Sequence, residues 1–361
     1  MAGKKVVIGL SGGVDSSVAA HLLKEEGYEV IGVTMQTWIP EKQEDNDPGM
    51  GGSPEVTKDA KEVAQALGIP YYVVDFQKEF SDHVMDYFSQ EYLAGRTPNP
   101  CVVCNRFVKW EALLKKARQL GADYIATGHY AKVTRLENGR YTLQTCDSTA
   151  KDQTYALYNL TQDQLAHTLM PVGDYTKDEI RGIASKIGLK VADKPDSQEI
   201  CFIPDHDYAK FIRNRTGMEI PAGNFVTADG QVLGKHKGII HYTIGQRKGL
   251  NLSMGHPVFV TEIRPKTNEV VIGESEDVFA PALRCEKVNF MGIEQFSEGM
   301  ELQAKIRYNH KGAPCVIEKI LSADEAVCRF LEPQRAVTPG QAVVFYRDGC
   351  VAAGGTITGQ V

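Results

Sequence analysis

The sequence lacks the features that mark membrane and secreted proteins. No apolar run approaches the roughly 20 residues that a membrane-spanning helix needs. The N-terminus runs from Met1 to Lys5 into an apolar segment, with no signal-peptide region before it. Eight cysteines in 361 residues are too few for a disulfide framework. We therefore expect a cytoplasmic protein with no membrane association, in which each cysteine is a candidate thiolate.

An excess of basic charge, the usual mark of nucleic-acid binding, is also missing, since the net charge is −6. The acidity is local. Residues 1–204 carry 22 Lys and Arg against 28 Asp and Glu, whereas the remainder carries 18 of each. Composition therefore leaves an RNA partner open.

A serine- and glycine-rich turn is the most informative segment that is present. Residues 11–17, Ser-Gly-Gly-Val-Asp-Ser-Ser, follow the apolar run 6–10 and lead into the apolar segment 18–23. This order predicts a strand, a glycine turn and a helix, with backbone N–H groups and the positive end of the helix dipole directed at one spot. Glycine lets the backbone approach an anion closely. The turn therefore predicts a phosphate site.

The type of phosphate site follows from a missing lysine. A P-loop kinase or GTPase turn ends in Lys followed by Ser or Thr, and this one has Asp15 there instead. The alternative is an ordinary strand-to-helix connection capped by Ser or Asp. The pattern resembles the SGGxDS signature of the ATP pyrophosphatases, which split ATP into AMP and pyrophosphate.

The spacing of apolar residues predicts the fold class of the first part of the chain. We expect strands at 29–35, 71–75 and 123–129, helices at 55–67, 78–93 and 107–120, and a proline-punctuated loop at 95–105. This alternation favours an α/β fold, a parallel sheet with helices on both faces that binds ligands at the carboxyl ends of its strands. The glycine turn, Met35 and Gly128-His129 meet at that edge.

The pattern changes after about residue 205, where helical segments become scarce. Four strand-like segments follow one another after about residue 282, at 302–308, 315–320, 326–330 and 342–346. We therefore expect three domains: an ATP-binding catalytic domain (1–204), a small mixed central domain that contacts RNA (205–280) and a C-terminal β-barrel (281–361).

Three of the eight cysteines are candidates for chemistry. Cys101 and Cys104 form a C-x-x-C, for which half a zinc site, a redox dithiol and chance are all open; no second pair completes a zinc site. Cys201 lies in an apolar context, where a small buried cysteine is equally plausible. The other five lie in strand-like segments and are expected to be packing residues: Cys146, Cys285, Cys315, Cys328 and Cys350.

Several motifs in order make the chain similar to the tRNA-specific 2-thiouridylases, enzymes that replace O2 of the wobble uridine by sulfur. Besides the glycine turn they are NPCVVCN at 99–105, GHY at 128–130, KDQTY at 151–155, DSQEICF at 196–202 and TIGQRKG at 243–249. The resemblance extends to Gly340-Gln341 and so covers nearly the whole chain.

The resemblance implies an ATP-dependent sulfurtransferase that uses Mg²⁺ and adenylates the base before sulfur is transferred. ATP would be held by Gly9, Leu10, Ser11, Gly12, Gly13, Val14, Asp15, Ser16, Met35 and Gly128. Cys201 would carry a persulfide, and Cys104 would be the nucleophile that releases sulfide or closes a disulfide with it. The target base would lie against Asn99, Pro100 and Cys101. The tRNA would be contacted by His129, Lys151, Asp152, Gln153, Arg307, Tyr308 and Gln341.

Some questions stay open at this point. Some members of the family have an acid where Cys101 stands, so an iron–sulfur cluster on Cys101, Cys104 and Cys201 is an alternative to the persulfide. The sulfur donor would be a cysteine desulfurase or a relay protein. Two other functions compete: an ATP pyrophosphatase that adenylates a small carboxylate or purine without cysteines, and an adenine-nucleotide sensor or RNA-binding module without chemistry.

Overall fold

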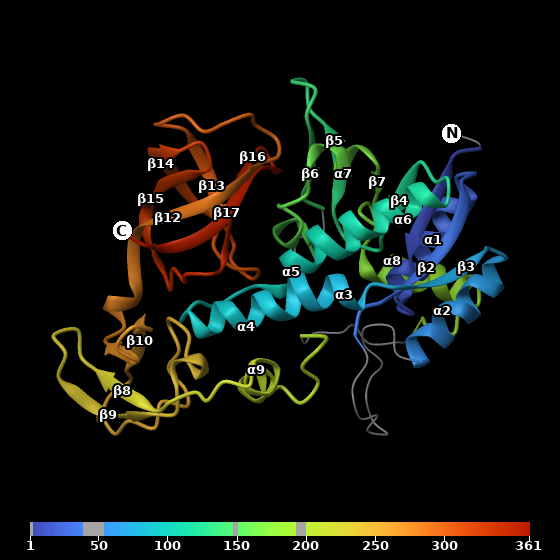
Figure 1. Cartoon of the computed structure of the whole chain (residues 1–361). Coiled ribbons are helices and arrows are strands. Elements are labelled where there is room, and N and C mark those ends of the chain that lie inside the picture. The colour runs from blue at the N-terminus through green and yellow to red at the C-terminus, as the bar shows by residue number, and fades with distance from the viewer. Residues whose placement is uncertain (1–2, 39–53, 147–150, 193–199) are drawn as a thin grey trace. The chain divides into compact units, whose positions relative to one another are not determined.

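The computed structural model describes residues 3–38, 54–146, 151–192 and 200–361, and the chain divides into two compact units (Figure 1). The first unit comprises Met1–Met85, Cys101–His206 and Gly349–Val351. The second comprises Asp86–Pro100, Asp207–Asp348 and Ala352–Val361.

A five-stranded parallel sheet forms the centre of the first unit, in the order β3-β2-β1-β4-β7. Val6, Val7 and Ile8 of its middle strand are completely buried, as expected for an apolar strand covered on both faces. The strands are β1 (Lys5–Gly9), β2 (Glu29–Gln36), β3 (Tyr71–Asp75), β4 (Tyr124–Ala126) and β7 (Thr168–Leu169). A hairpin of β5 (Lys132–Arg135) and β6 (Tyr141–Gln144) is also present, and its Gln144 pairs with Cys350 of β17 (Cys350–Gln360), so that the hairpin continues the sheet of that strand.

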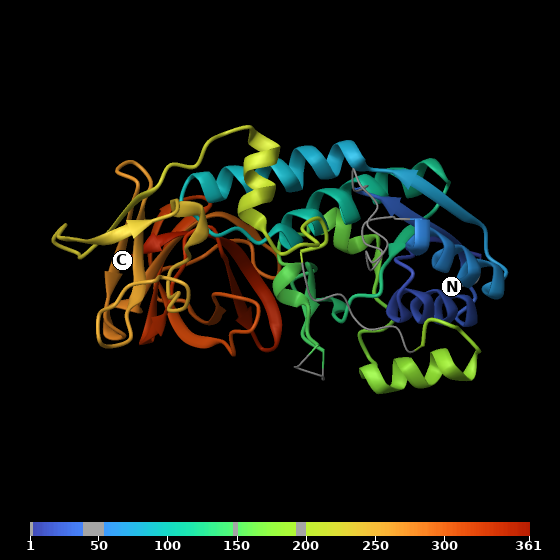
Figure 2. The ribbon, with the colours of Figure 1, turned by 90° about the horizontal axis from the view of Figure 1, so that it is seen from below.

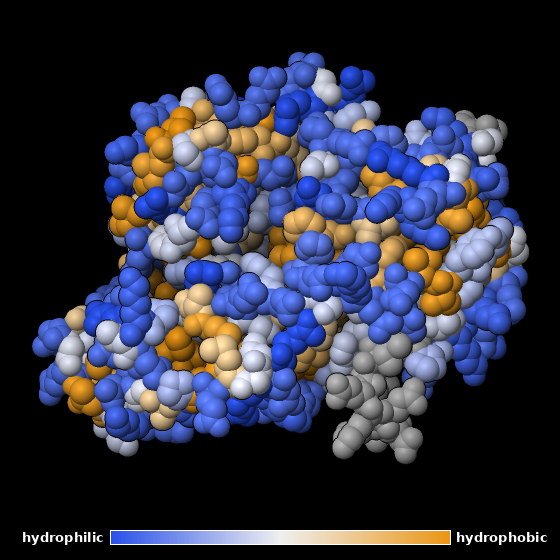
Figure 3. Space-filling view, in the orientation of Figure 1, coloured by the Kyte–Doolittle hydropathy of each residue, from blue (hydrophilic) through white to orange (hydrophobic). Residues whose placement is uncertain are grey.

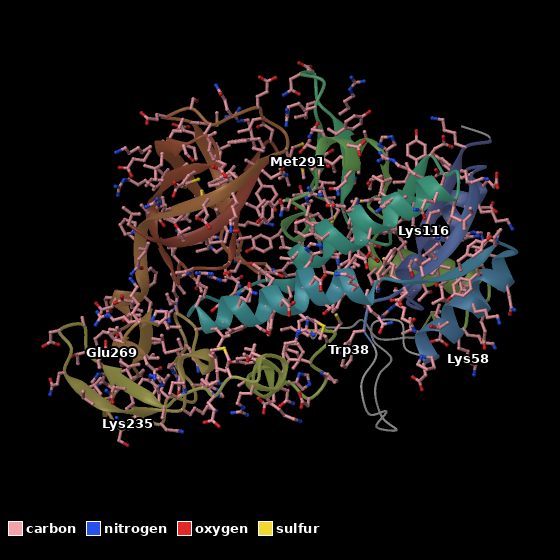
Figure 4. The ribbon with its side chains drawn as sticks, viewed as in Figure 1. Trp38, Lys58, Lys116, Lys235, Glu269 and Met291 are labelled. Carbon is pink, nitrogen blue, oxygen red and sulfur yellow. The ribbon has the colours of Figure 1, made fainter. Side chains whose placement is uncertain are left out.

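Helices cover both faces of the parallel sheet (Figure 2). Helices α1 (Val14–Glu25), α2 (Pro54–Leu67) and α8 (Lys177–Lys186) share one hydrophobic cluster with Val6 and Ile8. On the opposite face α6 (Leu113–Gln119) packs against β1 and β4. Lys58 and Lys116 mark α2 and α6 in Figure 4. The arrangement confirms the predicted α/β fold class.

The remaining helices of this unit are short. They are α3 (Gln77–Phe80), the π-helices η1 (Ser81–Met85) and η2 (Cys104–Ala112), the 3₁₀-helix η3 (Thr154–Ala156) and α7 (Gln162–Ala166); α5 (Pro100–Val103) spans the division between the units.

The second unit contains a four-stranded sheet and a closed barrel. The sheet has the order β10-β11-β8-β9, and the barrel runs β12-β15-β14-β13-β16-β17 and closes by pairing of β12 with β17. Its elements are α4 (Asp86–Leu93), α9 (Tyr208–Thr216), β8 (Gly223–Val226), β9 (Val232–His236), η4 (Ile239–His241), β10 (Phe259–Arg264), β11 (Glu269–Gly273), η5 (Glu276–Val278), β12 (Phe279–Phe290), β13 (Glu301–Lys305), β14 (Ala313–Ser322), β15 (Glu325–Arg335), β16 (Ala342–Arg347) and β17 (Cys350–Gln360). The four strands predicted after residue 282 are therefore present as β13 to β16.

One predicted loop is wrong in its second half, since residues 95–99 are irregular and residues 100–105 are helical. Residues 95–105 were expected to be irregular, but a helix begins at Pro100 and continues through η2 and α6 to Gln119. Proline suits the first position of a helix, because its fixed φ is helical and its missing N–H would have no partner there. Cys101 and Cys104 therefore lie in the first turns of a helix.

The face drawn in Figure 3 is mostly hydrophilic, with smaller hydrophobic patches between the polar residues. Among the described residues, no helix combines the length and the apolar character that crossing a bilayer requires.

Candidate functional site

The glycine turn joins β1 to α1 as the sequence predicts. Gly13 is the N-cap of α1, and the hydroxyl groups of Ser16 and Ser17 both donate to its carbonyl oxygen, over 3.2 and 2.8 Å. The backbone N–H of Ser11 donates to Ser16 Oγ over 3.2 Å. The first N–H groups of a helix have no acceptor within it, and the helix dipole is positive at this end. The turn can therefore bind a phosphate group.

Two glycines in this region have conformations or contacts that exclude a side chain. Gly12 has a φ of +66°, in the left-handed region that favours glycine. Gly128 follows β4, and a Cβ on it would lie 2.6 Å from the backbone nitrogen of Ser16 and 2.8 Å from the carbonyl carbon of Asp15. Residue 128 therefore lies directly against the turn, and Met35 also lies nearby, since its Cε would be 3.4 Å from a Cβ on Gly9.

Asp15 is the centre of a polar cluster that joins three distant parts of the chain. Lys177 Nζ donates to both of its carboxylate oxygens over 2.8 Å, and the hydroxyl of Tyr130 donates to Oδ1 over 2.7 Å. Lys177 is the first residue of α8, which is stabilised by a capping box between Thr176 and Glu179. Sequence reasoning missed Lys177, because a lysine beside a capping box gives no signal of its contact with a residue 162 positions away.

The first unit also brings the three candidate cysteines together. Burial raises the pKa of the Cys104 thiol to about 11. The pKa of Cys201 is raised to about 12, mainly by burial and in addition by charge repulsion from Cys104 and Cys101. Such repulsion requires the sulfur atoms to lie near one another. Both thiols are therefore neutral at pH 7. Of the motif that contains Cys201, residues 196–199 lie outside the described residues.

Lys109 is a second residue that the sequence analysis missed. Its ammonium group lowers the pKa values of Cys104, Cys201 and His129. At the two thiols this opposes the larger effect of burial, which raises the pKa. At the histidine it adds to the effect of burial, which lowers the pKa. Cys104 and Lys109 both belong to η2, and in a π-helix the residue five positions along lies one turn above. An α-helix would instead align residues three and four positions apart. The π-helix thus places a cation beside the thiol.

His129 is held in a neutral state. Its pKa lies well below the usual range because burial and the charge of Lys109 both disfavour the imidazolium. Its Nδ1 lies 2.9 Å from Thr127 Oγ1, and its ring is 5.4 Å from the ring of the buried Trp110. A contact of His129 with RNA would therefore use hydrogen bonding or stacking.

The segment 151–153, which we expect to contact tRNA, is hydrogen-bonded to Tyr130 through Gln153. The backbone N–H of Gln153 donates to the Tyr130 carbonyl over 2.9 Å, and Gln153 Oε1 accepts from the Tyr130 N–H over 2.8 Å. Asp152 is buried and its Oδ2 accepts from Thr154 Oγ1 over 2.8 Å. Lys151 is half-buried.

Other predicted RNA and base contacts lie in the second unit, among them Asn99, which is half-buried, and Pro100, which is buried. Arg307 and Gln341 line a cavity of about 350 Å³ together with Thr97, Thr243 and Arg335. Gln341 Nε2 donates to the Thr97 carbonyl over 2.8 Å, and Arg307 donates to the Arg335 carbonyl over 2.9 Å. Tyr308 is exposed.

The structure gives no support to the iron–sulfur alternative. Within the described ranges, no three His, Cys, Asp or Glu side chains are grouped so that they could hold a metal ion, and this includes Cys101, Cys104 and Cys201. All eight cysteines are described, and none forms a disulfide.

Models of three protein families match consecutive parts of the chain. They are described as the tRNA methyl transferase HUP domain (residues 4–205), the tRNA methyl transferase PRC-barrel domain (209–274) and the aminomethyltransferase beta-barrel domain (281–357).

Curated relatives are similar over nearly the full length. The chain is 62% identical over 357 residues to the tRNA-specific 2-thiouridylase MnmA of Lachnoclostridium phytofermentans, covering 98% of this chain and 99% of that protein. It is 55% identical over 356 residues to the same enzyme of Carboxydothermus hydrogenoformans, covering 98% and 97%. A solved 4-thiouridine synthetase–RNA complex with bound ATP shows 18% identity and a TM-score of 0.35, over 60% of this chain and 51% of that one.

Replacing Gly128 tests its close approach to the turn. Gly128→Ala places a methyl group 2.6 Å from Ser16 N, so the backbone must shift and the turn must widen. We expect the Kd for ATP, measured by calorimetry, to rise about tenfold. Gly182→Ala is the matched control, because a Cβ there meets nothing within 4 Å. An unchanged Kd in Gly128→Ala would contradict the assignment.

Replacing Lys109 tests its effect on the thiols. Removal of a nearby cation raises the pKa of a thiol, so Lys109→Gln should slow alkylation of Cys104 and Cys201 by iodoacetamide about tenfold at pH 8. Peptide mass spectrometry measures the rate at each cysteine. Lys109→Arg should retain the wild-type rate, as should Lys115→Gln, which changes an exposed lysine on α6. Equal rates in Lys109→Gln and the wild type would refute the effect.

Proposed function

The chain belongs to the family of tRNA-specific 2-thiouridylases, and from this membership we propose that it uses ATP to replace O2 of the wobble uridine U34 by sulfur. It is accordingly a tRNA-uridine 2-sulfurtransferase. The observation that carries the proposal is the presence of two neighbouring thiols, Cys104 and Cys201, in the same unit as the phosphate-binding turn. An enzyme that adenylates a small carboxylate would not need these thiols.

The first step in this proposal activates the base. O2 of the uridine attacks the α-phosphorus of ATP, a P–O bond breaks, and pyrophosphate leaves with the electron pair. Residues Gly9 to Ser16 bind the phosphates through backbone N–H groups and hydroxyls, with Met35 and Gly128 beside them. Lys177 neutralises phosphate charge. Mg²⁺, for which the Asp15 carboxylate is a suitable hard ligand, would supply further charge neutralisation when bound with ATP.

The second step transfers sulfur. The terminal sulfur of a Cys201 persulfide forms a bond to C2, and AMP leaves with the electron pair of the C–O bond. The Cys104 thiolate then attacks Cys201 Sγ; the persulfide S–S bond breaks, and its electrons remain on the sulfur attached to C2. The products are 2-thiouridine and a Cys104–Cys201 disulfide, which an external thiol reductant returns to two thiols. Lys109 favours the anionic sulfur that this step requires.

The tRNA is proposed to bind through residues of both units. An anticodon loop presents an unstacked base, which can be reached at low cost. Asn99, Pro100 and Cys101 are proposed to contact that base. The RNA contacts are proposed at His129, Lys151, Asp152, Gln153, Arg307, Tyr308 and Gln341. A cysteine desulfurase or a sulfur-relay protein is the proposed donor, and the cytoplasm is the proposed location, since the tRNA substrate is found there.

A division into a catalytic domain (1–204), a central tRNA-contacting domain (205–280) and a C-terminal barrel (281–361) is also proposed. Its support is the succession of family-model matches at 4–205, 209–274 and 281–357.

Reconstitution tests the proposed function. The chain is incubated with unmodified tRNA, ATP, Mg²⁺, a cysteine desulfurase with cysteine, and a thiol reductant. We expect 2-thiouridine at the wobble position, detected by mass spectrometry of digested tRNA, together with AMP. Formation of AMP from a small carboxylate substrate, with no thiolated tRNA, would refute the proposal.

The division of labour between the two steps gives a separate prediction. Cys201→Ala removes the sulfur carrier but leaves the phosphate-binding turn intact, so thiolation should be abolished while tRNA-dependent AMP formation continues at a rate within about threefold of the wild type. Cys285→Ala, which changes a buried cysteine of the barrel, is the control and should retain thiolation. Loss of both AMP formation and thiolation in Cys201→Ala would contradict the assigned roles.

A further inference from the structure

An unbroken series of hydrogen bonds runs from the segment 151–153 to the phosphate-binding turn. Gln153 holds the backbone of Tyr130 on both sides, through its N–H (2.9 Å to the Tyr130 carbonyl) and its Oε1 (2.8 Å from the Tyr130 N–H). The side chain of Tyr130 then reaches Asp15 Oδ1 over 2.7 Å, and Asp15 contacts Lys177 Nζ over 2.8 Å. These residues all belong to the first unit.

The burial of Tyr130 restricts the movement of its side chain relative to its backbone. The residue is only 3% exposed and belongs to the hydrophobic cluster that also contains Val14 and Val18 of α1. A buried aromatic ring in a close-packed core has little freedom to adjust, so a displacement of its backbone moves its hydroxyl. The bond at its other end joins a hydroxyl to a carboxylate, and such charge-assisted bonds are stronger than bonds between neutral groups.

The position of Asp15 determines where the ammonium group of Lys177 lies. Its carboxylate lies in the first turn of α1 and accepts hydrogen bonds from the ammonium group of Lys177. Any movement of the Tyr130 hydroxyl therefore changes the orientation of the carboxylate and, through it, the position of Lys177.

From this arrangement we propose that Tyr130 is a positioning residue that couples RNA binding at residues 151–153 to the alignment of Asp15 and Lys177 at the phosphate turn. The inference rests on the proposed function. It predicts that ATP cleavage depends on bound tRNA: RNA that contacts Lys151 and Gln153 shifts the backbone of Tyr130, and the hydroxyl then moves the carboxylate and the lysine into alignment for departure of pyrophosphate.

The test compares AMP formation with and without saturating tRNA. In Tyr130→Phe the ring remains and only the hydroxyl is lost, so we expect the ratio of the tRNA-stimulated kcat to the unstimulated rate to fall at least about fivefold. Tyr71→Phe is the matched control: it also removes a tyrosine hydroxyl of the first unit, that of a half-buried residue which donates to Thr34 Oγ1 over 2.8 Å, and should retain the wild-type ratio. A wild-type ratio in Tyr130→Phe would overturn the inference.

A second variant covers the case in which Tyr130→Phe does not fold, as judged by its thermal unfolding. Gln153→Met keeps the side-chain length and removes the acceptor of the Tyr130 N–H, so it should lower the same ratio at saturating tRNA; an unchanged ratio would overturn the inference. Because Tyr130 and Gln153 act in one series, the double variant should show the ratio of the more affected single variant, and independent, multiplying effects would refute the coupling. If wild-type enzyme shows no stimulation by tRNA, the proposed function itself fails, which is a distinguishable result.

Discussion

The close approach of Gly128 to the backbone of Asp15 and Ser16 is the constraint on which the first unit depends. A contact at this distance is possible only without a Cβ, and it brings the segment after β4 against the start of α1. The two residues that follow Gly128 thereby come near the turn region: the ring of His129 lies 5.4 Å from that of Trp110 in a tilted arrangement, and the hydroxyl of Tyr130 donates to Asp15. The absence of one methyl group at residue 128 thus lets the glycine turn, Tyr130 and the contact between Asp15 and Lys177 lie close together in the first unit.

The sequence predicted those parts of the molecule whose signals are local. The glycine turn, the apolar strands of the parallel sheet and the run of strands after residue 282 each follow from spacing and residue type within a few positions. The helix beginning at Pro100 was predicted as a loop, because several prolines in a short segment usually indicate irregular backbone, whereas only Pro100 is at a helix start. Lys177 and Lys109 were missed for different reasons: the first acts across 162 positions, and the second depends on a π-helical turn that spacing rules do not anticipate.

The electrostatics of the two candidate thiols, Cys104 and Cys201, keep both of them protonated at neutral pH. Burial alone raises the pKa values of Cys104 and Cys201 far above neutral pH, and the single ammonium of Lys109 offsets only part of this effect. A neutral, half-buried thiol resists oxidation and alkylation, because the thiolate is the reactive form. In the proposed mechanism, the persulfide and the bound substrate are what change the acidity and the burial of these sulfur atoms.

The contacts at the start of β17 affect the order in which parts of the chain can fold during synthesis. Residues Gly349–Val351 belong to the first unit, where Thr142 Oγ1 donates to the Val351 carbonyl over 2.6 Å and the Thr145 N–H donates to the Gly349 carbonyl over 2.9 Å. A nascent chain ordinarily completes its N-terminal portion first. Here the hairpin near residue 140 bonds a segment 209 positions later in the chain, so this part of the first unit can close only after that segment has been synthesised.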